Sequence, residues 1–265
     1  MLLECSNLSK SYGDVQALKG VTFSLSRGLS LILGPNGSGK TTLIKILAGI
    51  TKPDGGTLKL LGKNYFEVPR SDIGFAFEKT ILPPNVRVEG YLRAVAELRG
   101  EDNVDDIIEI FGLGKHRTKR FRELSQGYKR RFIAAMAFAG GPKVVFLDEP
   151  FSNVDIIAKI ELVEAFFELR KKIDIVIVSH VLAGLKDVDS LVLLHGGQVI
   201  MNVFGNEAKT LGGFRAVFPD EVVENDINRL VELIRSGKEP MRIEPVFPEE
   251  FIQRKLLGGW NIRQR

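Results

Sequence analysis

The first stretch of this chain that could do chemistry is residues 34–41, which read GPNGSGKT and fit the phosphate-loop pattern G-x-x-x-x-G-K-[ST] at every position. Because glycine has no Cβ atom, such a loop can curl tightly and aim several backbone N–H groups at one phosphate. Lys40 adds a mobile positive charge for the outer phosphates of a nucleotide, and the Thr41 hydroxyl is a hard oxygen ligand that suits Mg2+. The predicted nucleotide-binding residues here are Gly34, Asn36, Gly37, Ser38, Gly39, Lys40, Thr41 and Thr42.

Two carboxylates and a histidine follow later apolar runs of the chain. Asp148 and Glu149 come directly after residues 143–147, which have the β-branched composition of a buried strand. Buried carboxylates are costly without a cation or polar partners, so we predict that Asp148 holds Mg2+ and that Glu149 activates a water molecule. His180 follows another apolar run, residues 173–178. A contact between His180 and the γ-phosphate is one interpretation, and a purely structural histidine is the other.

Two further candidates depend on position alone. Tyr12 lies in a turn ahead of the phosphate loop, where its ring could stack on a nucleobase or could simply pack or face solvent. Ser125 and Gly127 precede an apolar helical run, residues 132–139, and Ser125 is a natural N-cap residue. The free N–H groups at a helix start attract anions, so this segment is a second place where the backbone could meet a phosphate.

A scaffold of strands and helices must position these residues. Leu43, Ile46 and Leu47 predict a helix over residues 42–48, which Gly49 is placed to end and whose N-terminus faces the phosphates. Predicted strands cover residues 29–33, 57–61, 73–78, 143–147 and 173–178, with strand pairs over 2–28 and 191–203 and a helix over 160–172. The fold class is α/β: a phosphate-loop NTPase core with an N-terminal antiparallel β subdomain and an inserted α-helical subdomain at about residues 88–141.

The composition is that of an ordinary globular chain, with 44% hydrophobic and 26% charged residues among 265. The net charge of +4 is not concentrated in one long basic block, so it does not by itself indicate a nucleic-acid partner. The single cysteine, Cys5, excludes an internal disulfide and suits a reducing compartment. No apolar stretch approaches the ~20 residues of a spanning helix, and Glu4 interrupts the short apolar start, so we expect no signal peptide and, at a membrane, action through a partner.

Five motifs in their order and spacing resemble one family, the nucleotide-binding subunits of ATP-binding-cassette (ABC) transporters, from about residue 2 to residue 204. The motifs are Walker A (residues 34–42), the signature LSQGY continued to Arg131 (residues 124–131), Walker B (residues 144–149), the D-loop (residues 152–155) and the switch histidine, His180. Tyr12 falls where the family has its adenine-stacking aromatic residue. Walker A alone indicates only nucleotide binding, whereas a signature motif in a helical insertion ahead of Walker B is far more specific.

The resemblance implies an ATPase that uses ATP and Mg2+. Glu149 would be the general base, Asp148 a magnesium ligand, and Lys40 and His180 would stabilise charge on the γ-phosphate. The cassette would occupy residues 1–204, which leaves residues 205–265 as a C-terminal extension with no chemistry assigned.

The resemblance also implies partners. Two such subunits, identical or paralogous, would close head to tail around two ATP molecules, so that Ser125, Gln126 and Gly127 contact the nucleotide held by the other subunit. Reopening of the pair would drive a separate membrane-spanning permease. The chain would therefore be a cytoplasmic protein, peripheral on the inner face of the cell membrane, with no direct nucleic-acid partner.

The chain departs from the common family pattern at a few positions. Glu78 stands where the family usually has a glutamine that meets magnesium, and we predict that Glu78 also lies in the metal shell, with a surface acid as the alternative. Gln126 and Tyr128 replace the usual glycine and glutamine of the signature. Together with residues 244–251, which are similar to an acidic and aromatic ending, these variants favour the subgroup that serves export permeases.

The main alternative is a soluble ABC ATPase that acts on ribosomes or DNA. The ribosome-associated kind usually carries two cassettes, whereas this chain has one Walker A motif, and the DNA-repair kind carries a long coiled coil or zinc modules that are not visible here. A degenerate, non-catalytic cassette is the third interpretation. The joint presence of Lys40, Asp148, Glu149 and His180 argues against it.

Overall fold

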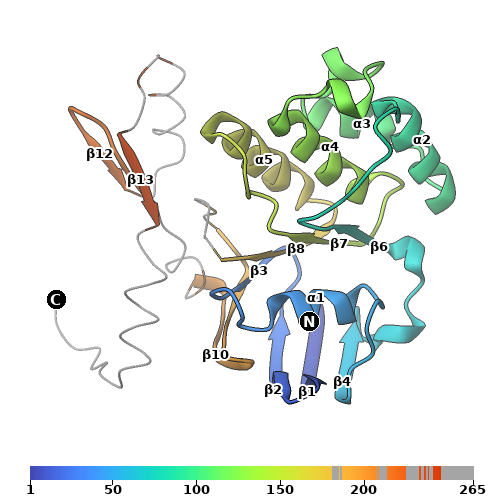
Figure 1. Ribbon diagram of the computed structural model, residues 1–265, viewed down its shortest axis with the longest axis vertical. Helices are drawn as coiled ribbons and strands as arrows, with labels where there is room; N and C mark the ends of the chain where they lie inside the picture. Colours follow the sequence, from blue (N-terminus) through green and yellow to red (C-terminus); the bar gives the residue numbers. More distant parts are fainter. Residues whose placement is uncertain are drawn as a thin grey trace.

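The computed structural model of the chain is layered, with a central sheet between a group of helices on one side and a single helix and a second sheet on the other (Figure 1). The structure describes residues 1–180, 185, 187–206, 208, 214–224, 233, 236, 238 and 241–245. Layers of this kind form because each sheet face carries apolar side chains that must be covered.

The central sheet contains six strands, five of which run parallel. They are β3 (Leu29–Leu33), β6 (Ile73–Ala76), β7 (Val144–Asp148), β8 (Asp174–Ser179), β9 (Ser190–His195) and β10 (Gln198–Phe204), in the spatial order β10-β9-β3-β8-β7-β6. β10 pairs antiparallel with β9 and closes the predicted hairpin. Every residue of β3, β7 and β8 is buried, as expected for parallel strands that are covered on both faces.

The second sheet is antiparallel and lies below the first in Figure 1. It consists of β1 (Leu3–Tyr12), β2 (Val15–Leu25), β4 (Gly55–Leu60) and β5 (Lys63–Asn64), in the order β2-β1-β4-β5. Helix α1 (Lys40–Leu47) fills the space between the two sheets, and Gly49, with φ of +72°, follows its last turn as predicted. Leu43 and Ile46 of α1 join Phe23 of β2 and Phe146 of β7 in one apolar core.

The helices on the other face form the second apolar core with the central sheet (Figure 1). They are α2 (Val88–Arg99), α3 (Val104–Ile110), α4 (Gln126–Phe138) and α5 (Ile156–Leu169). Short 3-10 turns lie at Tyr65–Glu67, Arg70–Asp72, Gly114–His116 and Phe121–Glu123. The predicted bounds of the last helix, residues 160–172, are wrong. Asp155 caps it by accepting a hydrogen bond from the Ala158 amide at 2.8 Å, so α5 begins four residues earlier.

The C-terminal part of the chain contributes a small separate sheet in the order β12-β11-β13. Its strands are β11 (Phe214–Val217), β12 (Val222–Glu224) and β13 (Arg242–Pro245), and Figure 1 draws β12 and β13 beside the main body. Of the segment at residues 244–251 that favoured the export subgroup, residues 246–251 lie outside the described residues. None of the described helices has both the length and the hydropathy that crossing a bilayer requires.

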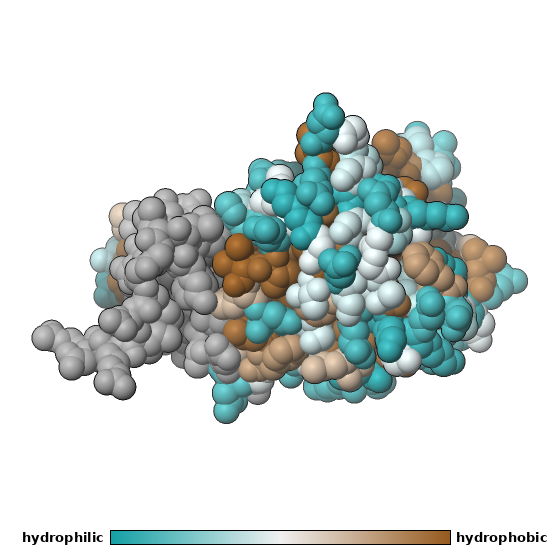
Figure 2. All heavy atoms as spheres, turned by 90° about the horizontal axis from the view of Figure 1, so that it is seen from below, coloured by the Kyte–Doolittle hydropathy of each residue, from teal (hydrophilic) through white to brown (hydrophobic). Residues whose placement is uncertain are grey.

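The surface on the side of the antiparallel sheet mixes hydrophilic and apolar areas (Figure 2). Large apolar side chains of the described residues that remain exposed include Met1, Val15, Ile50 and Phe66. Singly exposed apolar residues are normal for a folded protein, so they carry no argument about a partner.

Candidate functional site

Most of the predicted functional residues meet where parallel strands end. The carboxyl ends of parallel strands lie at the same edge of a sheet, and ligands of open α/β sheets bind just beyond that edge. At this edge β3 leads into Gly34, β6 ends two residues before Glu78, β7 ends on Asp148 and β8 is followed by His180. The sheet order β3-β8-β7-β6 therefore brings together residues that are far apart in the sequence.

The phosphate loop has a backbone that only glycine can adopt at certain positions. Gly37 and Gly39 have φ of +78° and +104°, in the left-handed region that side chains rarely enter. A Cβ atom on Gly39 would lie 2.7 Å from the Ala17 carbonyl oxygen, and one on Gly34 would lie 2.3 Å from the Leu194 carbonyl oxygen. The loop thus packs its backbone directly against β2 and β9, which fixes its curl.

The Lys40 side chain folds back onto the phosphate loop. Its ammonium group donates hydrogen bonds to the carbonyl oxygens of Gly34 at 2.6 Å and Pro35 at 3.0 Å. Burial lowers the pKa of Lys40, and three nearby carboxylates oppose that shift. The hydroxyl of Ser38, buried in the same loop, has no hydrogen-bond partner. A phosphate in the loop would supply an acceptor for both groups.

A hollow of about 450 Å3 lies over the loop and the strand ends. Most of the predicted site residues line it: Asn36, Gly37, Ser38, Gly39, Lys40, Thr41, Thr42, Glu78, Asp148 and Glu149. Lys19, which also lines this hollow, was not singled out in the sequence. The wall combines loop amides and lysines with carboxylates, groups that can bind a phosphate and a divalent cation.

The carboxylates fit a divalent cation. Asp148 is 9% exposed, and burial, followed by the charges of Glu149 and Glu78, raises its pKa to about 6. A bound divalent cation would reduce the repulsion among these carboxylates, and the Thr41 hydroxyl lies in the same wall as a further oxygen donor. Among the described residues no cluster of three or more His, Cys, Asp or Glu could hold a metal alone, so a complete ligand shell needs Thr41, phosphate oxygens or water.

Glu149 is fixed by its neighbours on β8. Its amide donates to the Val178 carbonyl oxygen at 2.8 Å, and its φ of +47° is unusual for a residue with a side chain. Ser179 donates from its hydroxyl to Glu149 Oε2 at 2.9 Å, and His180 Nδ1 lies 2.9 Å from Oε1. The carboxylate is therefore held at both of its oxygens. Sequence reasoning missed the role of Ser179, although its place next to His180 pointed to this strand end.

Other predicted residues lie outside the hollow. Ser125 caps α4, accepting a hydrogen bond from the Tyr128 amide at 3.4 Å, and Ser125 and Gln126 are exposed to solvent. Gly127 follows in the first turn of α4. Tyr12 is 47% exposed, with the Lys10 ammonium 5.6 Å from its ring centre, and it is not part of the wall. Their nucleotide contacts stay predictions.

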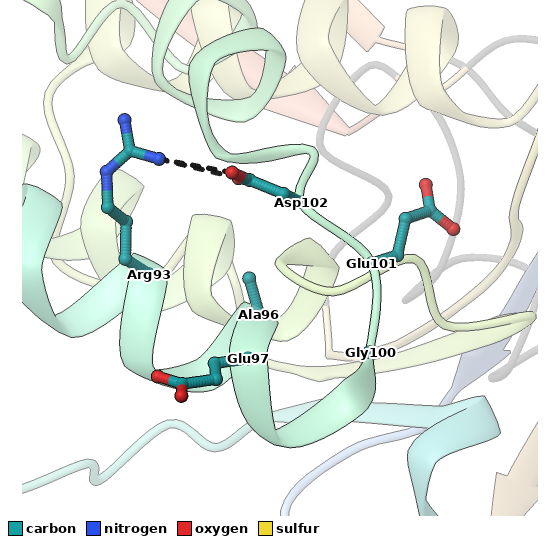
Figure 3. A pocket seen from close by; sticks show the side chains of 6 residues that line it. All are labelled: Arg93, Ala96, Glu97, Gly100, Glu101 and Asp102. Carbon is teal, nitrogen blue, oxygen red and sulfur yellow. Dashed lines mark hydrogen bonds and ion pairs between the residues drawn. The ribbon is translucent and has the colours of Figure 1, made fainter.

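A second hollow, of about 420 Å3, lies in the helical subdomain at the end of α2. The Arg93 side chain reaches across it toward Asp102, while Glu97 and Glu101 line its rim (Figure 3). Arg93 is also paired with Glu89 at 2.9 Å. Because the Arg93 guanidinium is already paired with Glu89 and Asp102, we assign no ligand to this hollow.

Comparison with known proteins adds an independent observation. A family model described as "ABC transporter" matches residues 18–152. The "Sulfate/thiosulfate import ATP-binding protein CysA" of Mycobacterium bovis is 34% identical over 206 residues, which cover 73% of this chain but only 59% of that protein. The "Lipoprotein-releasing system ATP-binding protein LolD" of Bacteroides fragilis is 30% identical over 216 residues, covering 75% of this chain and all of that protein. A solved "ATP binding subunit of ABC transporter" superposes with a TM-score of 0.69 at 28% identity, over 78% of this chain and 91% of that one.

Proposed function

Because the chain belongs to the ABC transporter family, we propose that it is a subunit that binds and hydrolyses ATP and thereby powers a separate membrane permease. The observation that carries this proposal is the single hollow in which the phosphate loop, Lys40, Asp148 and Glu149 face one another. Phosphate-binding and water-activating groups are useful together only if a phosphoanhydride lies between them.

In this mechanism the loop amides and Lys40 hold the β- and γ-phosphates. Thr41, Asp148 and Glu78 would hold Mg2+, which when bound would neutralise charge on the phosphate oxygens. Glu149 takes the proton from the attacking water, and the contacts at both of its carboxylate oxygens hold it in place for that transfer. His180 keeps the Glu149 carboxylate in place and would add a hydrogen bond to the γ-phosphate.

We further propose that the working unit is a pair of cassettes, identical or paralogous, with ATP between them. The exposed start of α4 supports this, because Ser125, Gln126 and Gly127 lie outside the wall of their own chain's hollow. In a head-to-tail pair, that helix start would meet the nucleotide of the partner. Tyr12, which is half exposed at the end of β1, would stack on the adenine ring.

The permease partner would bring the chain to the inner face of the cell membrane from the cytoplasm. Residues 1–204 would carry the ATPase, and residues 205–265 form an extension to which we assign no chemistry. We propose further that the permease is an exporter, on the basis of the residue types at Glu78, Gln126 and Tyr128. The similar proteins named above include an import and a lipoprotein-releasing component, so transport direction does not follow from them.

Affinity purification of the chain from detergent-solubilised membranes tests the proposal. We expect a co-purifying protein with several apolar spans, together with Mg2+-dependent phosphate release from ATP. Recovery only with ribosomes or DNA, with no membrane partner, would replace the transport proposal by the alternative of a soluble ABC ATPase. Absence of Mg2+-dependent hydrolysis from the purified complex would refute the catalytic part.

A further inference from the structure

Arg130 is a buried cation in the second turn of α4 that sequence reasoning did not single out. Only 9% of the residue is exposed, and its guanidinium donates to backbone carbonyl oxygens from two loops. The acceptors are Glu78 at 2.9 Å, Pro150 at 3.1 Å, Asp148 at 3.2 Å and Glu149. One side chain of the signature helix thus holds the backbone beneath each of the active-site carboxylates.

The guanidinium supplies a donor to each of these carbonyl groups, and the Glu149 carbonyl oxygen also accepts from the Ser152 amide. β7 ends at Asp148, and the left-handed conformation of Glu149 turns the chain away from the sheet ladder. Buried carbonyl oxygens must find donors, and the planar guanidinium offers five N–H groups in a fixed fork. Hydrogen bonds from a charged donor are stronger than neutral ones, so Arg130 is well suited to hold this strained turn.

Glu149 is therefore held from two sides. β8 supplies the Val178 carbonyl for its amide and the Ser179 hydroxyl for its side chain, whereas α4 holds its carbonyl through Arg130. The two sides belong to different layers of the fold, the central sheet and the helical subdomain (Figure 1). Any displacement of α4 relative to the sheet must move one of these anchors.

We infer that Arg130 is a positioning residue that couples the location of the signature helix to the placement of Glu149 and Glu78. The inference rests on the proposed function, because it assigns consequences to Glu149 as general base. Arg130 lies five positions after Ser125 on one continuous helix. Nucleotide bound by a partner subunit would attract the start of α4 and so move the Arg130 guanidinium. That movement would shift the backbone of Glu149 and Glu78, so the rate of hydrolysis would depend on pairing of the two subunits.

Arg99, the last residue of α2, provides a matched control because it contacts the C-terminal end of α4. It is also a partly buried arginine whose guanidinium donates to backbone carbonyls, those of Met136, Ala137, Ala139 and, at 3.4 Å, Ile73. Burial lowers the pKa of both arginines. Arg99 touches no residue of the hollow, so its loss should affect folding without affecting chemistry.

The first test compares Arg130→Met and Arg130→Lys with Arg99→Met in purified protein. We expect Arg130→Met to lower kcat for ATP hydrolysis by about 10- to 100-fold with KM for ATP changed less than about threefold, since misplacing a catalytic group by ~1 Å costs that much. Arg130→Lys keeps the charge but not the fork, so it should retain an intermediate kcat. Arg99→Met should lower the midpoint of thermal unfolding yet keep kcat within about threefold.

A double variant separates this inference from the proposed function. If Arg130 acts through Glu149, adding Arg130→Met to Glu149→Gln should lower the remaining rate by less than about twofold, because groups that act as a unit are not additive. Multiplicative losses, or equal kcat losses in the Arg130 and Arg99 variants, overturn the inference and leave the proposed function intact. An unchanged rate in Glu149→Gln alone refutes the general base and with it this coupling.

Amide hydrogen exchange gives a readout that needs no activity. The Ser152 amide donates to the same Glu149 carbonyl oxygen, at 3.1 Å. Arg130→Met should therefore speed exchange at Glu149 and Ser152 by about tenfold or more, whereas Arg99→Met should not. Equal exchange rates in the two variants would overturn the inference even if the protein hydrolysed no ATP.

Discussion

His180 Nδ1 lies 2.9 Å from Glu149 Oε1, so the histidine that follows β8 contacts the proposed general base. The two residues follow neighbouring parallel strands, β8 and β7, and the spacing of those strands sets their distance. An isolated glutamate side chain samples several rotamers, and partners at both carboxylate oxygens favour one of them. The contact with His180 therefore restricts the positions that the Glu149 carboxylate can occupy.

Changing Glu149→Gln should abolish most of the hydrolysis. The amide keeps the size of the side chain but cannot take up the proton of the attacking water, and loss of a general base typically costs ~10²-fold or more. Steady-state phosphate release at saturating Mg2+ and ATP measures the effect, and equilibrium binding of ATP serves as the control because it should be nearly unchanged. A rate within about threefold of the parent would show that another group is the base.

Changing Lys40→Ala should weaken ATP binding itself. The ammonium is the only side-chain cation described as bridging carbonyl oxygens of the phosphate loop, and losing a charged hydrogen-bond donor to a phosphate costs about tenfold in affinity or more. The control is Lys45→Ala, an exposed lysine on the same helix. Fluorescence titration with a labelled ATP analogue compares the two, and equal dissociation constants would remove Lys40 from the binding site.

Changing Glu78→Gln should alter metal dependence rather than ATP affinity. Glu78 shares the hollow with Asp148 and contributes to the raised pKa of that carboxyl, so removing its charge changes the field at the cation. We expect the Mg2+ concentration for half-maximal hydrolysis to shift by about threefold or more. Glu97→Gln, an exposed acid on α2, is the control. Superimposable titrations of the parent and the Glu78 variant would exclude Glu78 from the metal shell.

Changing Ser125→Glu should prevent ATP-dependent pairing. In the Glu149→Gln background, ATP is bound but not consumed, so pairs should accumulate with ATP and not with ADP. A negative charge at the start of α4 would repel the partner's triphosphate, while ATP binding by the monomer through Lys40 should be largely retained. Light scattering at matched ATP and Mg2+ measures the mass. If the double variant pairs as readily as the Glu149→Gln variant, the start of α4 does not act on the partner's nucleotide. If Glu149→Gln alone does not pair, the comparison is repeated with a paralogous subunit present.

Changing Glu89→Gln should destabilise the helical subdomain in a pH-dependent way. Hydrogen bonds from Arg117, followed by those from Arg93, lower the pKa of Glu89 to about 2 from its ordinary 4.5. A depressed folded-state pKa stabilises the fold above pH 4.5, and this contribution is lost as the pH falls toward 2. Thermal unfolding should therefore show a larger gap between parent and variant at pH 7 than at pH 3.5. Glu97→Gln should show no such trend, and an equal gap at both pH values for Glu89→Gln would mean that these ion pairs add no stability.

The sequence alone determined the parts of this protein that depend on local geometry. Gly37 and Gly39 adopt the positive φ that the phosphate loop requires, and Ser125 caps α4 as its residue type predicts. The strand runs before Gly34 and Asp148 were recognisable because buried parallel strands are continuously apolar. The same local logic, applied to Asp155, would have given the true start of α5.

Tertiary structure decided which of these pieces touch. The order of strands in the central sheet brought Glu78, Asp148 and Glu149 to one wall, and no periodicity in the sequence encodes that order. The partners of Arg130 were equally hidden, since they are backbone carbonyls 18 to 52 residues away. Every residue type carries the same carbonyl group, so residue identity cannot reveal which of them a buried guanidinium will bind.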